Sequence, residues 1–161
     1  MATRSTIALE FADGTVGQVY CHWDGYLDYN GRLLLEHWSD PFKLRELIDL
    51  GALSSLSREI GDKHSFDNPG KYGTPEYDAY RQQVEHMCTF YARDRGEDLV
   101  NHFFKDFEDY KVNAEFEEYN YILRNVNNTP VWFVASYITS DRFVRLEYAM
   151  EVEANEKEMS E

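Results

Sequence analysis

The sequence predicts a single α+β domain in which helices pack on an antiparallel sheet of about five strands. Its 161 residues suit one domain with a core of its own. Hydrophobic residues make up 43% of the chain and aromatic residues 16%, which is too apolar for a disordered chain. Strand-like and helix-like hydrophobic patterns both occur, and turn-forming residues separate them.

The N-terminal segment is typical of a β-hairpin. Residues 5–11 and 16–21 are rich in β-prone side chains, and an Asp-Gly pair between them favours a tight turn. A second Asp-Gly pair at residues 24–25 marks another turn. Residues 29–38 are expected to form the first helix.

The strongest helix signal follows at residues 41–50. Asp40 can cap the N-terminus, and Pro41 suits the first turn because its missing N–H would have no partner there. Apolar side chains recur at helical spacing, and Gly51 stands where a left-handed residue often ends a helix. Residues 52–60 are expected to add a short helical piece.

The middle of the chain is predicted to alternate between loop and short elements. Residues 61–75 contain three Gly and two Pro, which predicts a long loop. A short helix, a strand and a charged turn are then expected at residues 76–85, 86–92 and 93–96. Apolar side chains between residues 100 and 107 recur at i, i+3, i+4 and i+7, which predicts another helix.

The C-terminal part is predicted to hold a second hairpin and an acidic end. Residues 119–124 and 131–137 have the pattern of two paired strands. Residues 143–153 fit either an alternating strand or a helix, and we favour the helix. The domain is expected to span residues 1–146, followed by an acidic tail at 147–161 with six acidic side chains and one lysine.

The charge balance excludes several classes of partner. Thirty acidic and sixteen basic residues give a formal net charge of −14. This charge repels nucleic-acid phosphates and anionic lipids, so we expect no direct nucleic-acid binding and no membrane association. No apolar run approaches the roughly 20 residues of a membrane span. Two cysteines favour reduced thiols over a disulfide framework, which indicates a cytoplasmic protein.

Three side chains suggest hydrolytic chemistry. His22 and Asp24 share one face of an extended segment, and His64 lies in the predicted long loop, so together they could form a small hydrolase site. Their spacing matches no zinc pattern, and the common phosphate-binding loops and the Gly-x-Ser-x-Gly elbow do not occur. We therefore expect no metal, no cofactor and no catalytic residues, and favour a binding protein over an enzyme.

A second set of residues suggests a ligand pocket. Arg93 and Arg95 flank Asp94 and are expected on one side of a strand end, where two guanidinium groups could grip a phosphate or carboxylate. With Trp23 and Tyr26 they could bind a nucleotide-like molecule. Alternatively, the arginines only neutralise nearby acids. The candidate ligand-binding residues are His22, Trp23, Asp24, Tyr26, His64, Arg93 and Arg95.

Several motifs together resemble a known family. Residues 19–26 read Val-Tyr-Cys-His-Trp-Asp-Gly-Tyr, after a Thr-Arg-Ser-Thr-Ile-Ala opening at residues 3–8 and before Leu-Leu-Glu-His at residues 34–37. In these motifs, and at residues 93–97 and 118–121, the chain resembles small proteins encoded by bacteriophages and prophages. The resemblance implies that the protein acts in the cytoplasm of an infected bacterium, and it assigns no catalytic residues to this chain.

These observations favour a phage-encoded accessory protein that acts in host takeover or against host defence. It is expected to bind a host bacterial protein through its acidic surface, because spread carboxylates can imitate the phosphates that a nucleic-acid-binding protein recognises. The same carboxylates can also serve solubility alone. The alternatives are the nucleotide-like ligand in the arginine and aromatic pocket, and the small hydrolase.

Overall fold

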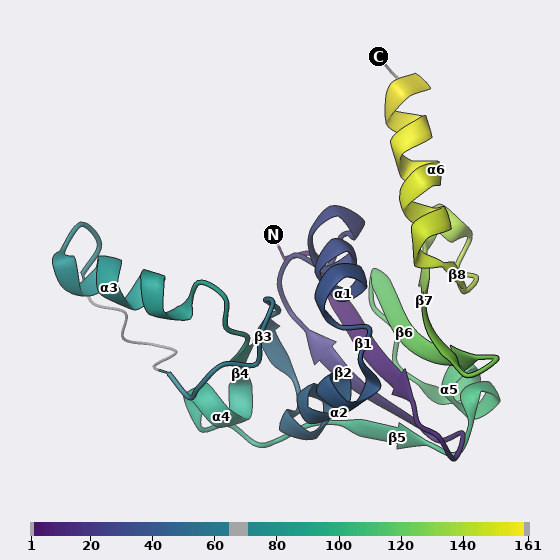
Figure 1. Ribbon diagram of the computed structural model, residues 1–161, viewed down its shortest axis with the longest axis horizontal. Coiled ribbons are helices and arrows are strands. Elements are labelled where there is room, and N and C mark those ends of the chain that lie inside the picture. The colour runs from purple at the N-terminus through teal and green to yellow at the C-terminus, as the bar shows by residue number, and fades with distance from the viewer. Residues whose placement is uncertain (1, 65–70, 160–161) are drawn as a thin grey trace.

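Strand β1 (Ser5–Glu10) is the centre of the computed structural model, which describes residues 2–64 and 71–159 (Figure 1). One edge of β1 pairs antiparallel with β2 (Val16–Cys21), and the other pairs in parallel with β6 (Tyr119–Val126). Helices cover both of its faces. A strand enclosed in this way carries no polar alternation, and its first five residues are buried.

Short strands extend this central group into a mixed sheet of eight strands. The order is β4 (Thr89–Phe90), β3 (Leu53–Ser55), β2, β1, β6, β7 (Thr129–Ser136) and β8 (Val144–Arg145). The eighth strand, β5 (His102–Phe104), shares the outer edge of β2 with β3. It pairs antiparallel with the first half of β2, whereas β3 pairs in parallel at Cys21.

The α+β class is confirmed, but the sheet differs from the predicted five antiparallel strands. Two strand pairs are parallel, β1 with β6 and β2 with β3. The β1–β6 pair joins distant segments, which a buried hydrogen bond of 2.9 Å between Thr6 and Asn120 also links. Strands β3, β5 and β8 contain only two or three residues each, too few for alternation to show in the sequence.

Helices form a layer on each face of the sheet. The π-helical turn η1 (Leu27–Gly31), α1 (Arg32–His37) and α2 (Pro41–Leu50) lie over one face, which they share with the start of α6 (Leu146–Met159). On the other face, α5 (Phe107–Asn113) places Tyr110 against Ala8 and Ile122. Two helices, α3 (Pro75–Val84) and α6, project away from the sheet in Figure 1.

The strongest local signals are confirmed. Helix α2 begins after Asp40, whose side chain accepts a 2.9 Å hydrogen bond from the backbone N–H of Phe42, and ends at Gly51 with a φ of 86°. Both predicted hairpins form, and Asn127 and Asn128 turn the second one with φ of 52° and 65°. The predicted helix at residues 76–85 is α3.

Four predictions of elements are wrong, and in two of them the pairing of distant strands overrides a local pattern. Residues 52–60 form β3 and irregular backbone, because the edge of β2 recruits them. Residues 100–107 form β5 and only the start of α5, for the same reason. The strand at residues 86–92 shortens to β4, and the charged turn at 93–96 belongs instead to α4 (Tyr91–Arg95).

The remaining expectations have mixed outcomes. Residues 143–153 contain both alternatives, because β8 runs directly into α6, which reaches far into the predicted tail. The predicted loop at residues 61–75 is described in part, since residues 65–70 lie outside the described residues. Within the described ranges, no helix is long and apolar enough to cross a lipid bilayer.

The Cys-His-Trp-Asp-Gly-Tyr segment continues β2 beside β3 and then turns into η1. Asp24 makes the turn with a φ of 59°. The next residue, Gly25, donates to the carbonyl of Thr3 at 2.8 Å and accepts a 2.6 Å hydrogen bond from the Tyr121 hydroxyl. A Cβ atom on Gly25 would lie 2.7 Å from Cβ of Ser5 and 2.8 Å from the Thr3 carbonyl oxygen. The glycine of the motif is therefore required for packing.

We predict that Gly25→Ala destabilises the domain by about 2 kcal/mol, because the added methyl group would clash with the Thr3 carbonyl oxygen and with Cβ of Ser5, which the backbone holds in place. Chemical denaturation followed by circular dichroism measures this change. Gly31→Ala is the control, since the nearest atom to a Cβ at that position is the Tyr121 hydroxyl oxygen at 3.3 Å. Equal stabilities of Gly25→Ala and the unmodified protein would contradict the packing role.

Candidate functional site

A cleft of about 350 Å³ lies between the motif that follows β2 and the C-terminal half of α3. Trp23, Asp24 and Tyr29 line it from the motif and η1. Tyr80 and Arg81 line it from α3. Residues from β3 and β4, with the segments beside them, complete the lining. Two of the residues predicted from the sequence, Trp23 and Asp24, therefore meet in one cavity.

The other two predicted residues of the motif lie beside this cleft without lining it. Nδ1 of His22 is 2.7 Å from the Tyr20 hydroxyl, in hydrogen-bond contact, and its ring packs edge-on against Trp23 with centroids 4.8 Å apart. Tyr26 is partly exposed, with its ring 6.2 Å from that of Tyr29. His22 and Tyr26 thus support the aromatic side chains that face the cleft.

Tyr29 presents a neutral hydroxyl group at the cleft. Partial burial raises its pKa above the ordinary tyrosine value, and the Asp24 carboxylate adds to the effect. The Tyr29 hydroxyl therefore stays protonated at neutral pH and can donate a hydrogen bond.

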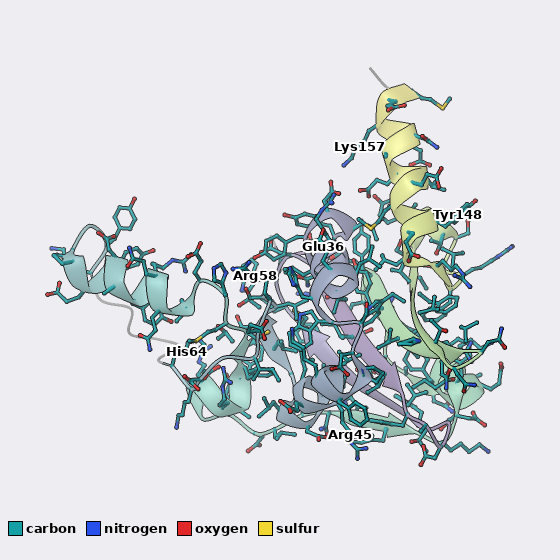
Figure 2. The ribbon with its side chains drawn as sticks, in the orientation of Figure 1. Glu36, Arg45, Arg58, His64, Tyr148 and Lys157 are labelled. Atoms are coloured by element: carbon teal, nitrogen blue, oxygen red, sulfur yellow. The ribbon has the colours of Figure 1, made fainter. Side chains whose placement is uncertain are left out.

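His64 is enclosed behind the cleft, between α3 and α4 (Figure 2). Its side chain is only 1% exposed. Nε2 lies 3.0 Å from the hydroxyl of Thr89, which itself lines the cleft, and Nδ1 lies 3.0 Å from the carbonyl oxygen of Asp62. His64 therefore fixes Thr89 from behind and has no open approach for a substrate.

The structure does not bring His22, Asp24 and His64 into one group. In the part of the chain that it describes, no three His, Cys, Asp or Glu side chains gather where they could hold a metal ion. The cysteines offer no nucleophile, since burial raises the pKa of Cys21 and of Cys88 to about 12 and both thiols stay protonated. The geometry thus gives the hydrolase alternative no assembled site.

Arg93 holds the backbone around α4 together. Its Nη1 donates to the carbonyl of Gly61 at 2.8 Å, and its Nη2 donates to the carbonyls of Ile60 and Cys88, each at 3.1 Å. Its Nε donates to the Asp94 carboxylate at 2.9 Å. With its side chain 14% exposed, Arg93 directs its donors at the protein and not at the cleft.

The Asp94 carboxylate is the buried partner of Arg93. It also accepts hydrogen bonds from the backbone N–H groups of Phe90 at 2.8 Å and of His64 at 3.0 Å. Burial opposes its ionisation, but the hydrogen bonds from Arg93 and from these two N–H groups outweigh that penalty and lower the pKa of Asp94. Asp94 is therefore an ionised anchor for two backbone segments, at His64 and at Phe90.

Arg95 points away from this network. Its side chain is largely exposed, and its Nε lies 3.6 Å from the Glu97 carboxylate. The expectation that Arg93 and Arg95 share one side of a strand end is wrong, because both belong to α4, where residues two apart differ in direction by about 200°. Neither arginine lines the cleft, and both pair with neighbouring acids.

No pattern in the sequence indicates that α3 contributes to the cleft. The helix itself was predicted, but no spacing in residues 76–85 shows that Tyr80 and Arg81 meet the motif more than fifty positions earlier. Arg81 is exposed and makes no ion pair with any residue that the structure describes. It is therefore the cation that the cleft offers to a ligand.

An acidic face on α6 is the second candidate site. Only Leu146 and Ala149 of this helix are buried. Lys157 turns toward the domain, 3.5 Å from carboxylates of Asp28 and Glu153, and Figure 2 shows it on the side of α6 opposite Tyr148. The charges of Glu153 and Asp28 raise the pKa of Lys157. The lysine thus neutralises the inner side of α6 and leaves the outer side acidic.

We predict that Arg93→Ala lowers the free energy of unfolding by about 3 kcal/mol, because it leaves the buried Asp94 carboxylate without its cation. Arg95→Ala, the matched control two residues away, is expected to change it by less than about 0.5 kcal/mol. Urea denaturation of both variants measures the difference. Similar stabilities of the two variants would show that the Arg93 network does not hold the domain together.

The structure therefore offers two candidate surfaces, the cleft and the outer side of α6. The cleft combines aromatic faces, hydroxyl groups, the Arg81 guanidinium and two carboxylates, those of Asp24 and Glu85. The acidic side of α6 offers a separate surface. Comparisons with known proteins add no activity: no protein-family model matches the chain, and no curated protein or solved structure matches it significantly.

Proposed function

We propose that this protein is a phage-encoded accessory protein that binds a host bacterial protein in the cytoplasm and so acts in host takeover or against host defence. The docking surface is the outer face of α6, and the partner presents a basic surface to it. The observation that carries this proposal is a row of unpaired carboxylates on a helix that stands clear of the domain (Figure 1).

Three glutamates form this row, which we call the acidic stripe: Glu147, Glu151 and Glu158. Their spacings of four and seven residues place them within about 40° of one another around the helix, over a length of about 16 Å. None of the three forms an ion pair within residues 2–64 and 71–159. Like charges on one face destabilise a helix slightly, and opposing cations on a partner would reverse that effect.

An exposed aromatic side chain lies next to the acidic stripe. Tyr148 is exposed over more than half of its surface and follows Glu147 directly. Tyrosines at the centre of an interface contribute strongly to affinity, because the ring buries apolar area while the hydroxyl keeps a hydrogen bond. The combination suits a protein partner better than it suits a solvated surface.

The whole-chain charge supports a basic partner. A net charge of −14 attracts cationic surfaces and accelerates encounter with them. Bacterial proteins that bind nucleic acids carry such surfaces, and carboxylates along a helix can occupy a groove built for phosphates. The resemblance to proteins of bacteriophages and prophages is the reason to propose that this partner belongs to an infected bacterium.

We predict that replacing the acidic stripe with glutamines, in Glu147→Gln, Glu151→Gln and Glu158→Gln together, weakens partner capture by tenfold or more, because a few lost charge pairs of about 0.5 kcal/mol each accumulate. Immobilised protein is incubated with bacterial lysate, and retained proteins are quantified by mass spectrometry. The charge-matched control carries Glu46→Gln, Glu76→Gln and Glu118→Gln and should retain the partner.

The salt dependence provides an independent readout. Raising the salt from about 0.1 M to about 1 M shortens the screening length from about 10 Å to about 3 Å and should release the partner. Equal retention by the acidic-stripe variant and the control, or retention that salt does not affect, would contradict the docking proposal.

A further inference from the structure

We propose that the cleft between the motif and α3 is a binding site for a nucleoside monophosphate. The site uses Trp23, Tyr29 and Tyr80 for the base, Arg81 for the phosphate, and Asp24 and Glu85 for the hydrogen-bond donors of the base or sugar. It is independent of the acidic stripe on α6, so either proposal can fail without the other.

The aromatic side chains supply the surface that a planar base needs. Trp23 and Tyr29 are each about 40% exposed, although large aromatic side chains usually bury more of their surface when they serve only packing. Tyr80 faces them from α3. A volume of about 350 Å³ lies in the range of small-molecule sites, which begins at roughly 300 Å³.

Arg81 provides the anion-binding group. A guanidinium group binds phosphate oxygens through two parallel N–H donors, and Arg81 has no competing carboxylate within ion-pair distance in the described part of the chain. The Glu85 carboxylate, one helical turn away, lies 3.8 Å from Nε2 of His86 and outside ion-pair distance of Arg81. The hydroxyl group of Ser55 also lines the cleft and can donate to the same ligand, and the Thr89 hydroxyl, which lies 3.0 Å from Nε2 of His64, can accept a hydrogen bond from that ligand.

The charge of the cleft limits how many phosphates it accepts. One cation faces two carboxylates, Asp24 and Glu85, so a triphosphate would bring far more negative charge than Arg81 can neutralise. The same carboxylates accept hydrogen bonds from amino or hydroxyl groups, which a nucleoside carries on both base and sugar. This ratio of one cation to two carboxylates favours a ligand that carries a single phosphate group and a single base.

The backbone turn at Asp24 is held in one conformation at the edge of the cleft. Asp24 has a φ of 59°, a left-handed conformation that costs free energy in a residue other than glycine and that is concentrated at binding sites. The Asp24 carbonyl accepts a 3.1 Å hydrogen bond from the N–H of Asn30. The next residue, Gly25, donates its own N–H to the carbonyl of Thr3. The turn therefore presents the Asp24 side chain to the cleft from a rigid support.

Isothermal titration calorimetry of the full chain with AMP, GMP, CMP and UMP tests the site. We expect at least one of them to bind with a dissociation constant below about 1 mM, and ATP and inorganic phosphate to bind more weakly. Trp23 supplies a second readout: it is 43% exposed, whereas Trp38 and Trp132 are at most 2% exposed, so a ligand in the cleft should quench its fluorescence.

Arg81→Gln isolates the phosphate contact. This exposed residue can be replaced without disturbing the core, and the variant should bind the monophosphate at least about tenfold more weakly while it binds the matching nucleoside as before. Arg95→Gln, which removes the same charge away from the cleft, should bind like the unmodified protein. The site assignment is overturned if no monophosphate binds with a dissociation constant below about 1 mM, if ATP binds more tightly than every monophosphate, or if Arg81→Gln and Arg95→Gln behave alike.

Discussion

The buried ion pair between Arg93 and Asp94 is the constraint on which the cleft side of the molecule depends. Strands β3 and β4 have three and two residues, so backbone pairing alone holds this region weakly. Arg93 donates to the carbonyls of two segments that precede β4, at residues 60–61 and at Cys88, and Asp94 accepts hydrogen bonds from the backbone N–H groups of His64 and Phe90. These protein groups occupy both the guanidinium and the carboxylate, so neither is free for a ligand. Removing one member of a buried ion pair is strongly destabilising because the other charge is left uncompensated.

The central strands and the projecting helices have separate roles. Burial of β1 between β2 and β6, with helices on both faces, supplies the apolar core. Helices α3 and α6 leave that core in different directions and carry the side chains that face solvent, Arg81 on one and the acidic stripe on the other (Figure 1). The two proposed binding surfaces therefore lie on helices whose outer faces do not pack against the core.

Local signals predicted the elements that local interactions stabilise. The Asp40 cap, the Asp-Gly turn and the second hairpin were visible because their determinants lie within a few residues. Strand β5 was missed because its pairing partner is about 85 positions away, and Phe103 and Phe104 suit a helix equally well. The motif singled out Trp23 and Asp24 as candidate site residues. The presence of Arg81 in the same cleft and the burial of Arg93 depend on contacts between distant segments, which no spacing in the sequence reveals.

Hydrogen–deuterium exchange with the captured host partner tests the central claim, binding through α6, most directly. The last two turns of this helix are exposed in the structure, so their amides should exchange rapidly in the free protein. Slower exchange across residues 147–159 in the complex is the predicted result, because docking would suppress helix opening. Unchanged exchange in α6, with protection confined to α2, β5 or another surface, would contradict the claim and place the partner there.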